Sequence, residues 1–272
     1  MIDEEWDILV IFDSCRYDIF RDTYKEYFPN AKLTKATNKY ITSTEDWLLN
    51  TFSNKDCSNI VYMCPIYSLR EWIKNWPGEH KFFHHVIEVW RTHWNREMET
   101  VLPDDMMKLS INTIKEYDDK RIVIHFMQPH HPYMYWGGHK TKTDDLKPYL
   151  GDKKPVKKIS YKRKFADFIE GICPHLFWRF TGRLNMLPEW NLGYIWYKHG
   201  RDGVVKGYTE DLKYILGCAK KIHNQFPNKK MVISADHGEE LGDGKIHKIY
   251  RMNYKLQRPK TKQVLEVPWC EV

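Results

Sequence analysis

Two short apolar segments that lie far apart in the sequence each end in residues that could bind a metal ion. The first, DILVIFDSCRYD, places Asp13 directly after its apolar residues. The second, MVISADHGEELGD, places Asp236 and His237 in the same position. Carboxylate oxygens with one imidazole nitrogen form a ligand set suited to Mn²⁺, Mg²⁺, Zn²⁺ or Ca²⁺. We therefore predict that Asp13, Asp236 and His237 bind one divalent ion.

The remaining sequence predicts a framework that can bring these residues together. Short apolar runs rich in β-branched residues are typical of strands buried on both faces, and stretches with helical spacing lie between them. The expected strands cover 7–12, 59–64, 121–127 and 231–235, with a last strand or edge at 264–269, and the expected helices cover 14–28, 45–52, 103–117 and 208–226. This alternation predicts an α/β fold, a three-layer α/β/α sandwich around a mostly parallel sheet. Sites in such sheets form beyond the carboxyl ends of the strands, so the polar residues that follow the strands should meet there.

Residues 137–205 break this alternation. They are rich in lysine at first and in aromatic residues later, and the stretch from Lys140 to Lys164 holds ten Lys or Arg against three Asp. We interpret 137–205 as an insertion or cap within a single domain that spans 1–272. A basic surface attracts phosphate esters, acidic glycans, nucleic acid or anionic lipid head groups, and a solvated basic loop is the alternative.

Composition narrows the class of protein further. The 272 residues carry a formal net charge of +7, and the six cysteines form no CxxC pair, so neither a zinc knuckle nor a redox motif is indicated. The first residues, MIDEEWDILV, lack the basic start of a signal peptide. No apolar stretch approaches the roughly 20 residues of a membrane span. We therefore expect a cytoplasmic protein without a transmembrane segment.

The quoted motifs resemble those of the alkaline phosphatase and sulfatase superfamily. DILVIFDSCRYD is similar to its first strand and metal-binding aspartate, SADHGEELGD to its distal DHGE motif, and HFMQPHHPY to a strand end that bears a histidine. The nearest likeness is to compact sulfatase-like proteins that begin with D-x-CRYD, and it covers most of the chain outside 137–205. The resemblance implies one catalytic metal ion and leaves a second ion open.

The resemblance also implies a nucleophile at a helix N-terminus some 30 residues after Asp13. The chain lacks the CxPxR motif of sulfatases and has YITSTEDWL instead. That stretch is similar to the TSxxEF sequence of lipoteichoic acid synthase-like and phosphoethanolamine transferase-like relatives, whose threonine is both nucleophile and metal ligand. Matching Trp47 to their phenylalanine indicates Thr42 for both roles. Ser43 and Thr44 stay alternatives, and all three residues could instead only cap the helix.

Further candidates surround the expected site. By chemistry, Arg16 could bind a phosphoryl oxygen, or it could form a salt bridge with Asp18. By resemblance, His130 would contact the transferred group or protonate the leaving oxygen, with His131 and His125 as alternatives. The resemblance also makes His247 a metal ligand or a substrate contact.

Three other histidine and acidic positions complete these expectations. His125 lies inside a strand, where a histidine is more often a core residue than a catalytic one. Glu239 and Glu240 should orient the metal ligands.

These residues predict a metal-dependent hydrolase or transferase of phosphate mono- or diesters that acts through a threonine nucleophile. One alternative is a sulfatase-like hydrolase of sulfuric esters. Another is a degenerate, non-catalytic member that binds anionic polymers or membranes, because FADFIEGICPHLFWRFTGRL could lie at a membrane surface. The expected partner is an anionic ester: a phosphorylated or sulfated small molecule, glycan or lipid head group. Nucleic acid is not expected, since no nucleic-acid-binding module is present.

Overall fold

A seven-stranded mixed sheet forms the centre of the molecule, which the computed structural model describes over residues 1–37, 40–66, 83–136, 192–243 and 260–272. The strand order is β2-β9-β8-β1-β7-β3-β4. The strands are β1 (Ile8–Asp13), β2 (Lys32–Thr37), β3 (Ile60–Cys64), β4 (His85–Glu88), β7 (Arg121–Pro129), β8 (Met231–Ala235) and β9 (Glu266–Glu271). Strands β8, β1, β7, β3 and β4 run parallel, whereas β9 is antiparallel to both β8 and β2. The prediction of a mostly parallel sheet is confirmed.

The register of the central strands determines which residues meet at the edge of the sheet. Strand β1 lies between β7 and β8. Phe12 pairs with Phe126 on one side and with Ala235 on the other, so the three strands end together. A bulge after Phe12 then brings Asp13 opposite Pro129.

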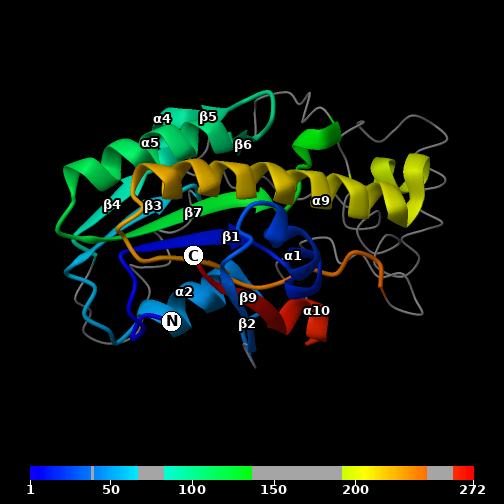
Figure 1. Ribbon diagram of the computed structural model, residues 1–272. Helices are drawn as coiled ribbons and strands as arrows, with labels where there is room; N and C mark the ends of the chain where they lie inside the picture. The colour runs from blue at the N-terminus through cyan, green and yellow to red at the C-terminus, as the bar shows by residue number, and fades with distance from the viewer. Residues whose placement is uncertain (38–39, 67–82, 137–191, 244–259) are drawn as a thin grey trace, which may run out of the picture.

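Helices cover both faces of the sheet. They are α1 (Tyr17–Thr23), η1 (Tyr24–Glu26), α2 (Thr44–Phe52), α4 (Val89–His93), α5 (Pro103–Glu116), η2 (Met134–Trp136), α9 (Leu192–Gln225) and α10 (Lys262–Leu265), with a small hairpin of β5 (Trp94–Asn95) and β6 (Thr100–Val101). Figure 1 shows α5 and α9 along one face and α2 on the other. None of the helices that the structure describes combines the length and the apolar character that a membrane crossing requires.

Two apolar cores separate these three layers. Alternate residues of β1 point to opposite faces, as expected of a strand. Val10 belongs to the core under α5 and α9, together with Leu212. Ile11 belongs to the core under α2, together with Trp47. The predicted α/β/α sandwich is therefore confirmed.

Helix α9 is longer than the predicted helix at 208–226. It begins at Leu192 and changes direction at Gly200, whose φ of 64° lies in the left-handed region that glycine adopts without strain. The indole of Trp136 stacks on the His199 ring at 4.2 Å and donates a hydrogen bond to the Gly203 carbonyl. The last part of the expected insertion, 192–205, is thus helix that packs on the sheet domain. The basic run and the rest of 137–205 lie outside the described residues.

Candidate active site

The metal ligands predicted from the sequence lie together at the carboxyl ends of β1 and β8. Asp13 is the last residue of β1, and Asp236 and His237 directly follow β8. One ligand atom from each residue lies within 4.8 Å of the others. Asp13 is 6% exposed, and Asp236 and His237 are fully buried. We refer to these three residues as the Asp-Asp-His cluster.

The two oxygens of Asp236 have different roles. Oδ1 accepts hydrogen bonds from the backbone N–H of Ser14 at 2.9 Å and of His237 at 2.8 Å. These bonds fix the carboxylate between β1 and β8. Oδ2 lies 3.5 Å from Nε2 of His237 and accepts the hydroxyl of Thr44 at 2.7 Å. Oδ2 is therefore the oxygen that faces the interior of the cluster.

A backbone carbonyl sets the tautomer of His237. Nδ1 lies 2.7 Å from the carbonyl oxygen of Gly238. A carbonyl oxygen can only accept, so Nδ1 carries the proton and Nε2 presents its lone pair. Nε2 lies 3.9 Å from Oδ1 of Asp13. The imidazole is thus oriented as metal-binding histidines usually are.

Gly238 allows the segment around α10 to approach this turn closely. Its N–H donates to the Val264 carbonyl at 2.7 Å. A Cβ at this position would lie 1.9 Å from the Gln263 carbonyl oxygen, a contact that no side chain can make. Glycine is therefore required in the DHG sequence for packing.

The donor set of the Asp-Asp-His cluster fits a divalent cation. Two carboxylates that are buried and close together are costly unless a cation compensates them. Oxygen donors with one imidazole match Mn²⁺, Zn²⁺, Mg²⁺ or Ca²⁺. The arrangement supports the predicted divalent metal.

The N-terminus of α2 brings Thr44 to this cluster, and Thr42 is placed differently. Ser43 is the N-cap of α2, where its hydroxyl accepts the N–H of Asp46 at 3.1 Å. The Thr42 hydroxyl donates to Oδ2 of Asp46 at 3.3 Å. Only the third hydroxyl, that of Thr44, bonds to Asp236. Thr42 and Ser43 therefore act as capping residues in this geometry, and Thr44 contacts the expected metal site.

Arg16 is held by two carboxylates. Its guanidinium donates two hydrogen bonds to Asp18, at 3.0 and 2.6 Å, and a third to Asp243. Burial lowers the pKa of Arg16, but these bonds outweigh burial and raise it above its ordinary value. The geometry therefore favours the salt-bridge alternative for Arg16 over a direct contact with a phosphoryl group.

A hydroxyl from α9 fixes the loop that follows Asp13. The backbone of Ser14 has a φ of 62°, an uncommon value for serine. The Tyr208 hydroxyl donates to the Ser14 carbonyl at 2.7 Å and accepts the N–H of Arg16 at 2.8 Å. Tyr208 is fully buried. No local pattern in the sequence indicates this contact.

A second polar group lies beyond the end of β7. Nδ1 of His130 is 3.0 Å from Oε1 of Glu239, and the His130 and His131 rings lie 4.4 Å apart. The segment that follows is fixed by Asp211, which accepts the N–H groups of Met134 and Tyr135. The predicted candidate His130 is therefore at the same edge of the sheet as Asp13.

The two remaining histidine candidates have different outcomes. His125 is fully buried, and its Nδ1 lies 2.6 Å from the Tyr62 hydroxyl. Burial lowers the pKa of His125 to about 4, so it is a neutral core residue. The prediction for His247 falls outside the described residues.

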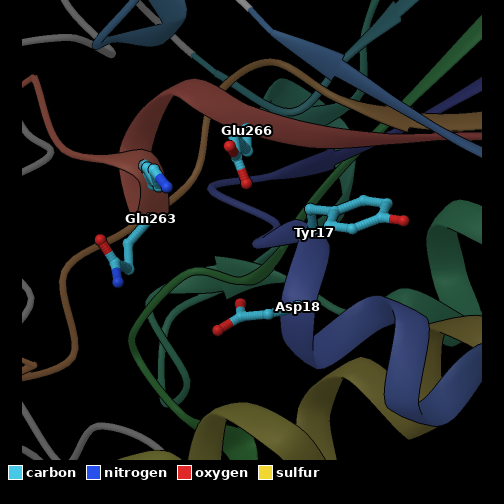
Figure 2. A pocket seen from close by; sticks show the side chains of 5 residues that line it. Tyr17, Asp18, Gln263 and Glu266 are labelled. Carbon is cyan, nitrogen blue, oxygen red and sulfur yellow. The ribbon is translucent and has the colours of Figure 1, made fainter.

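A pocket lies between α1 and the segment that contains α10. Its lining residues are Tyr17, Asp18, Lys262, Gln263 and Glu266. Figure 2 shows Tyr17 and Asp18 on α1 opposite Gln263 and Glu266. Asp18 bonds to Arg16, and the Gln263 carbonyl contacts Gly238. Two of its lining residues thus contact Arg16 and Gly238, which follow Asp13 and His237 in the sequence.

Comparison with known proteins identifies the fold. No protein-family model matches the chain, and no curated protein matches it. The soluble domain of lipooligosaccharide phosphoethanolamine transferase A from Neisseria meningitidis is 12% identical, with a TM-score of 0.52 over 97% of this chain and 75% of that one. A 2-O GAG sulfatase is 13% identical, with a TM-score of 0.53 over 99% and 64%.

Another similar structure contains zinc. It is the C-terminal periplasmic domain of EcEptC from Escherichia coli in complex with Zn, 13% identical, with a TM-score of 0.51 over 99% of this chain and 74% of that one. The chain spans about half of the integral membrane form of the Neisseria transferase, of which it covers 48%. At such low identity these matches show the shared fold alone. The predicted resemblance to the alkaline phosphatase superfamily is confirmed at that level.

Proposed function

We propose that this protein is a metal-dependent phosphoryl-transfer enzyme whose nucleophile is Thr44. The observation that carries the proposal is the 2.7 Å hydrogen bond between Oγ1 of Thr44 and Oδ2 of Asp236. It places a hydroxyl at the N-terminus of a helix and beside three residues suited to a divalent ion. Among the three candidates Thr42, Ser43 and Thr44, we therefore propose the alternative Thr44 in place of Thr42.

The arrangement suits in-line displacement at phosphorus. A bound divalent ion would lower the pKa of the Thr44 hydroxyl and neutralise charge on the transferred group. Oγ1 of Thr44 would form a bond to phosphorus as the bond to the leaving oxygen breaks. The N-terminal N–H groups of α2 favour an anion at this position. Water or an acceptor alcohol would then cleave the phosphothreonine and restore Thr44.

Phosphate esters are favoured over sulfate esters because the candidate nucleophile is an unmodified threonine. The substrate is an anionic ester. His130, at the same edge, is retained as the group that contacts the transferred group or protonates the leaving oxygen. The cytoplasmic location stays a prediction.

The test compares hydrolysis of p-nitrophenyl phosphate, bis-p-nitrophenyl phosphate and p-nitrophenyl sulfate in the presence of Mn²⁺ or Zn²⁺. Metal-dependent release from a phosphate ester that is lost in Thr44→Ala and Asp236→Asn would support the proposal. Turnover of the sulfate alone would support the sulfatase alternative. Bound metal with full activity in Thr44→Ala would exclude Thr44 as the nucleophile.

A further inference from the structure

The hydroxyl of Tyr133 is buried near the carboxyl end of β7 and lacks a hydrogen-bond partner. Tyr133 is 2% exposed. Across the part of the chain that the structure describes, no donor or acceptor lies within hydrogen-bond distance of this hydroxyl. A buried tyrosine usually directs its O–H to a partner, and each native exception requires a physical explanation. By contrast, the hydroxyl of the adjacent Tyr208 is bonded to the backbone on both sides.

The ring of Tyr133 is fixed, so its hydroxyl has a defined direction. The ring packs edge-on against Tyr208 at a centroid distance of 6.4 Å and against His131 at 6.5 Å. The backbone N–H groups of the next two residues are bonded to Asp211 of α9. The hydroxyl therefore cannot turn toward solvent unless this segment unpacks.

Charged groups from the loops of the active site act on this hydroxyl. Burial raises the pKa of Tyr133. The nearby charges of Glu239 and Asp211 raise this pKa further, and the charge of Arg16 lowers it. Arg16 belongs to the loop that follows β1, and Glu239 belongs to the loop that follows β8. The hydroxyl is thus close to the two loops that adjoin the Asp-Asp-His cluster, and it stays protonated as a donor.

The carboxylates around Tyr133 are bonded to other groups. Both oxygens of Asp211 accept backbone N–H groups. Oε1 of Glu239 lies 3.0 Å from Nδ1 of His130. Neither carboxylate accepts the Tyr133 O–H. The donor is therefore available to an oxygen of a bound molecule.

We propose that Tyr133 is a substrate-binding residue, whose hydroxyl donates a hydrogen bond to an oxygen of the anionic ester. The inference rests on the proposed function, which brings such an ester to these strand ends. Thr44 belongs to α2, whereas the Tyr133 ring packs against α9, on the opposite face of the sheet (Figure 1). The two hydroxyls thus reach the ester from opposite sides. A charged phosphoryl oxygen is a stronger acceptor than a neutral one.

The test measures binding of inorganic phosphate, without turnover. The full chain is loaded with Mn²⁺ or Zn²⁺, and phosphate binding to wild type and to Tyr133→Phe is followed by calorimetry. Phenylalanine keeps the ring and removes only the donor. A hydrogen bond to a charged group contributes roughly 10- to 100-fold to affinity, so the Kd for phosphate should rise by about tenfold or more. The number of bound metal ions should stay the same.

Stability distinguishes this role from a structural one. Because the Tyr133 hydroxyl has no partner among the described residues, its removal should leave the urea midpoint of unfolding unchanged or raise it. Tyr208→Phe removes two hydrogen bonds and should lower that midpoint. Tyr24→Phe is the matched control for binding, since Tyr24 is 6% exposed and stacks on Phe20 at 5.6 Å. It should bind phosphate as wild type does. Tyr133→Met, which also lacks a donor, carries the test if Tyr133→Phe does not fold.

Three results would overturn the inference. One is equal phosphate affinity in wild type and Tyr133→Phe. Another is a midpoint of Tyr133→Phe that falls as far as that of Tyr208→Phe, because the hydroxyl would then bond within the protein. The third is a metal-loaded wild type that binds no phosphate, and hydrolysis of p-nitrophenyl phosphate would still decide the proposed function separately. If Thr44 is not the nucleophile, phosphate binding and this comparison are unaffected.

Discussion

Thr44 and Asp236 are 192 residues apart in the chain, and their side chains are joined by a 2.7 Å hydrogen bond. The bond connects the N-terminus of α2 to the carboxyl end of β8. This bond distinguishes Thr44 from Thr42 and Ser43, because the Thr42 hydroxyl bonds to Asp46 and Ser43 caps the helix.

Thr44→Ala should therefore abolish turnover, whereas Thr42→Ala should not. Loss of a nucleophile costs on the order of 10³-fold or more in kcat. Thr42→Ala removes one partly buried hydrogen bond of the cap and should lower kcat by less than about tenfold. The measurement is kcat for p-nitrophenyl phosphate at saturating metal. An inactive Thr42→Ala with an active Thr44→Ala would restore the assignment made from the sequence.

The different placement of these threonines shows which part of the site could not be predicted from the sequence. Asp13, Asp236 and His237 were identified because they follow apolar runs, and buried parallel strands bring such ends together. The choice of Thr42 relied on matching Trp47 to a phenylalanine. Which hydroxyl faces the cluster depends on how α2 packs on the sheet, and that packing has no local signal.

Long-range contacts and polar edge strands were missed for similar reasons. Tyr208 meets Ser14 across 194 residues, and nothing near Tyr208 in the sequence marks it. Strand β2, KLTKAT, is largely exposed and lacks an apolar run. The stretch 264–269 was predicted as a last strand or edge: β9 is the last strand of the described chain, but it lies between β2 and β8 and not at an edge of the sheet.

Tyr208→Phe tests the link between α9 and the loop that follows Asp13. The change leaves the buried Ser14 carbonyl and the Arg16 N–H without their partner. An unsatisfied buried group of this kind costs about 1–3 kcal/mol of stability. We expect the free energy of unfolding, measured in urea, to fall by about 2 kcal/mol or more. Metal affinity should fall with it, because Ser14 N–H holds Asp236.

Tyr214→Phe is the control on the same helix. The Tyr214 hydroxyl donates to Asp104 at 2.6 Å, but this tyrosine is 46% exposed. Water can replace the lost bond, so the free energy of unfolding should change by less than about 0.5 kcal/mol. Equal effects of the two changes would argue against a special role for Tyr208.

The buried His125 should make the protein sensitive to acid. Burial lowers its pKa from 6.5 to about 4. Between those values the unfolded chain takes up a proton that the folded chain does not, so stability falls as pH falls. His125 should lower the free energy of unfolding by roughly 3 kcal/mol between pH 7.5 and 4, at about 1.4 kcal/mol for each unit of its pKa shift.

The measurement is the difference in free energy of unfolding between wild type and His125→Phe, in buffer with a chelator. Taking the difference removes the contributions of other titrating groups, including Asp211, whose pKa burial raises to about 7. The advantage of wild type should be largest at pH 7.5 and should shrink toward pH 4. A difference that is constant with pH would show that His125 titrates normally.

Gly238→Ala tests whether close packing, as well as the metal ligands, fixes the DHG turn. The added Cβ would lie 1.9 Å from the Gln263 carbonyl oxygen, a backbone atom that cannot move without displacing α10 and β9. We expect a loss of about 2 kcal/mol or more in the free energy of unfolding, since overpacking a buried site costs about 1–3 kcal/mol.

Gly217→Ala in α9 is the control, because its Cβ would be 3.7 Å from the nearest atom, on Tyr27. There the greater helix propensity of alanine should stabilise the protein by about 0.5–1 kcal/mol. If Gly238→Ala lowers the free energy of unfolding and Gly217→Ala raises it, the turn at Gly238 depends on the contact with α10. If Gly238→Ala leaves the free energy of unfolding unchanged, this contact can relax.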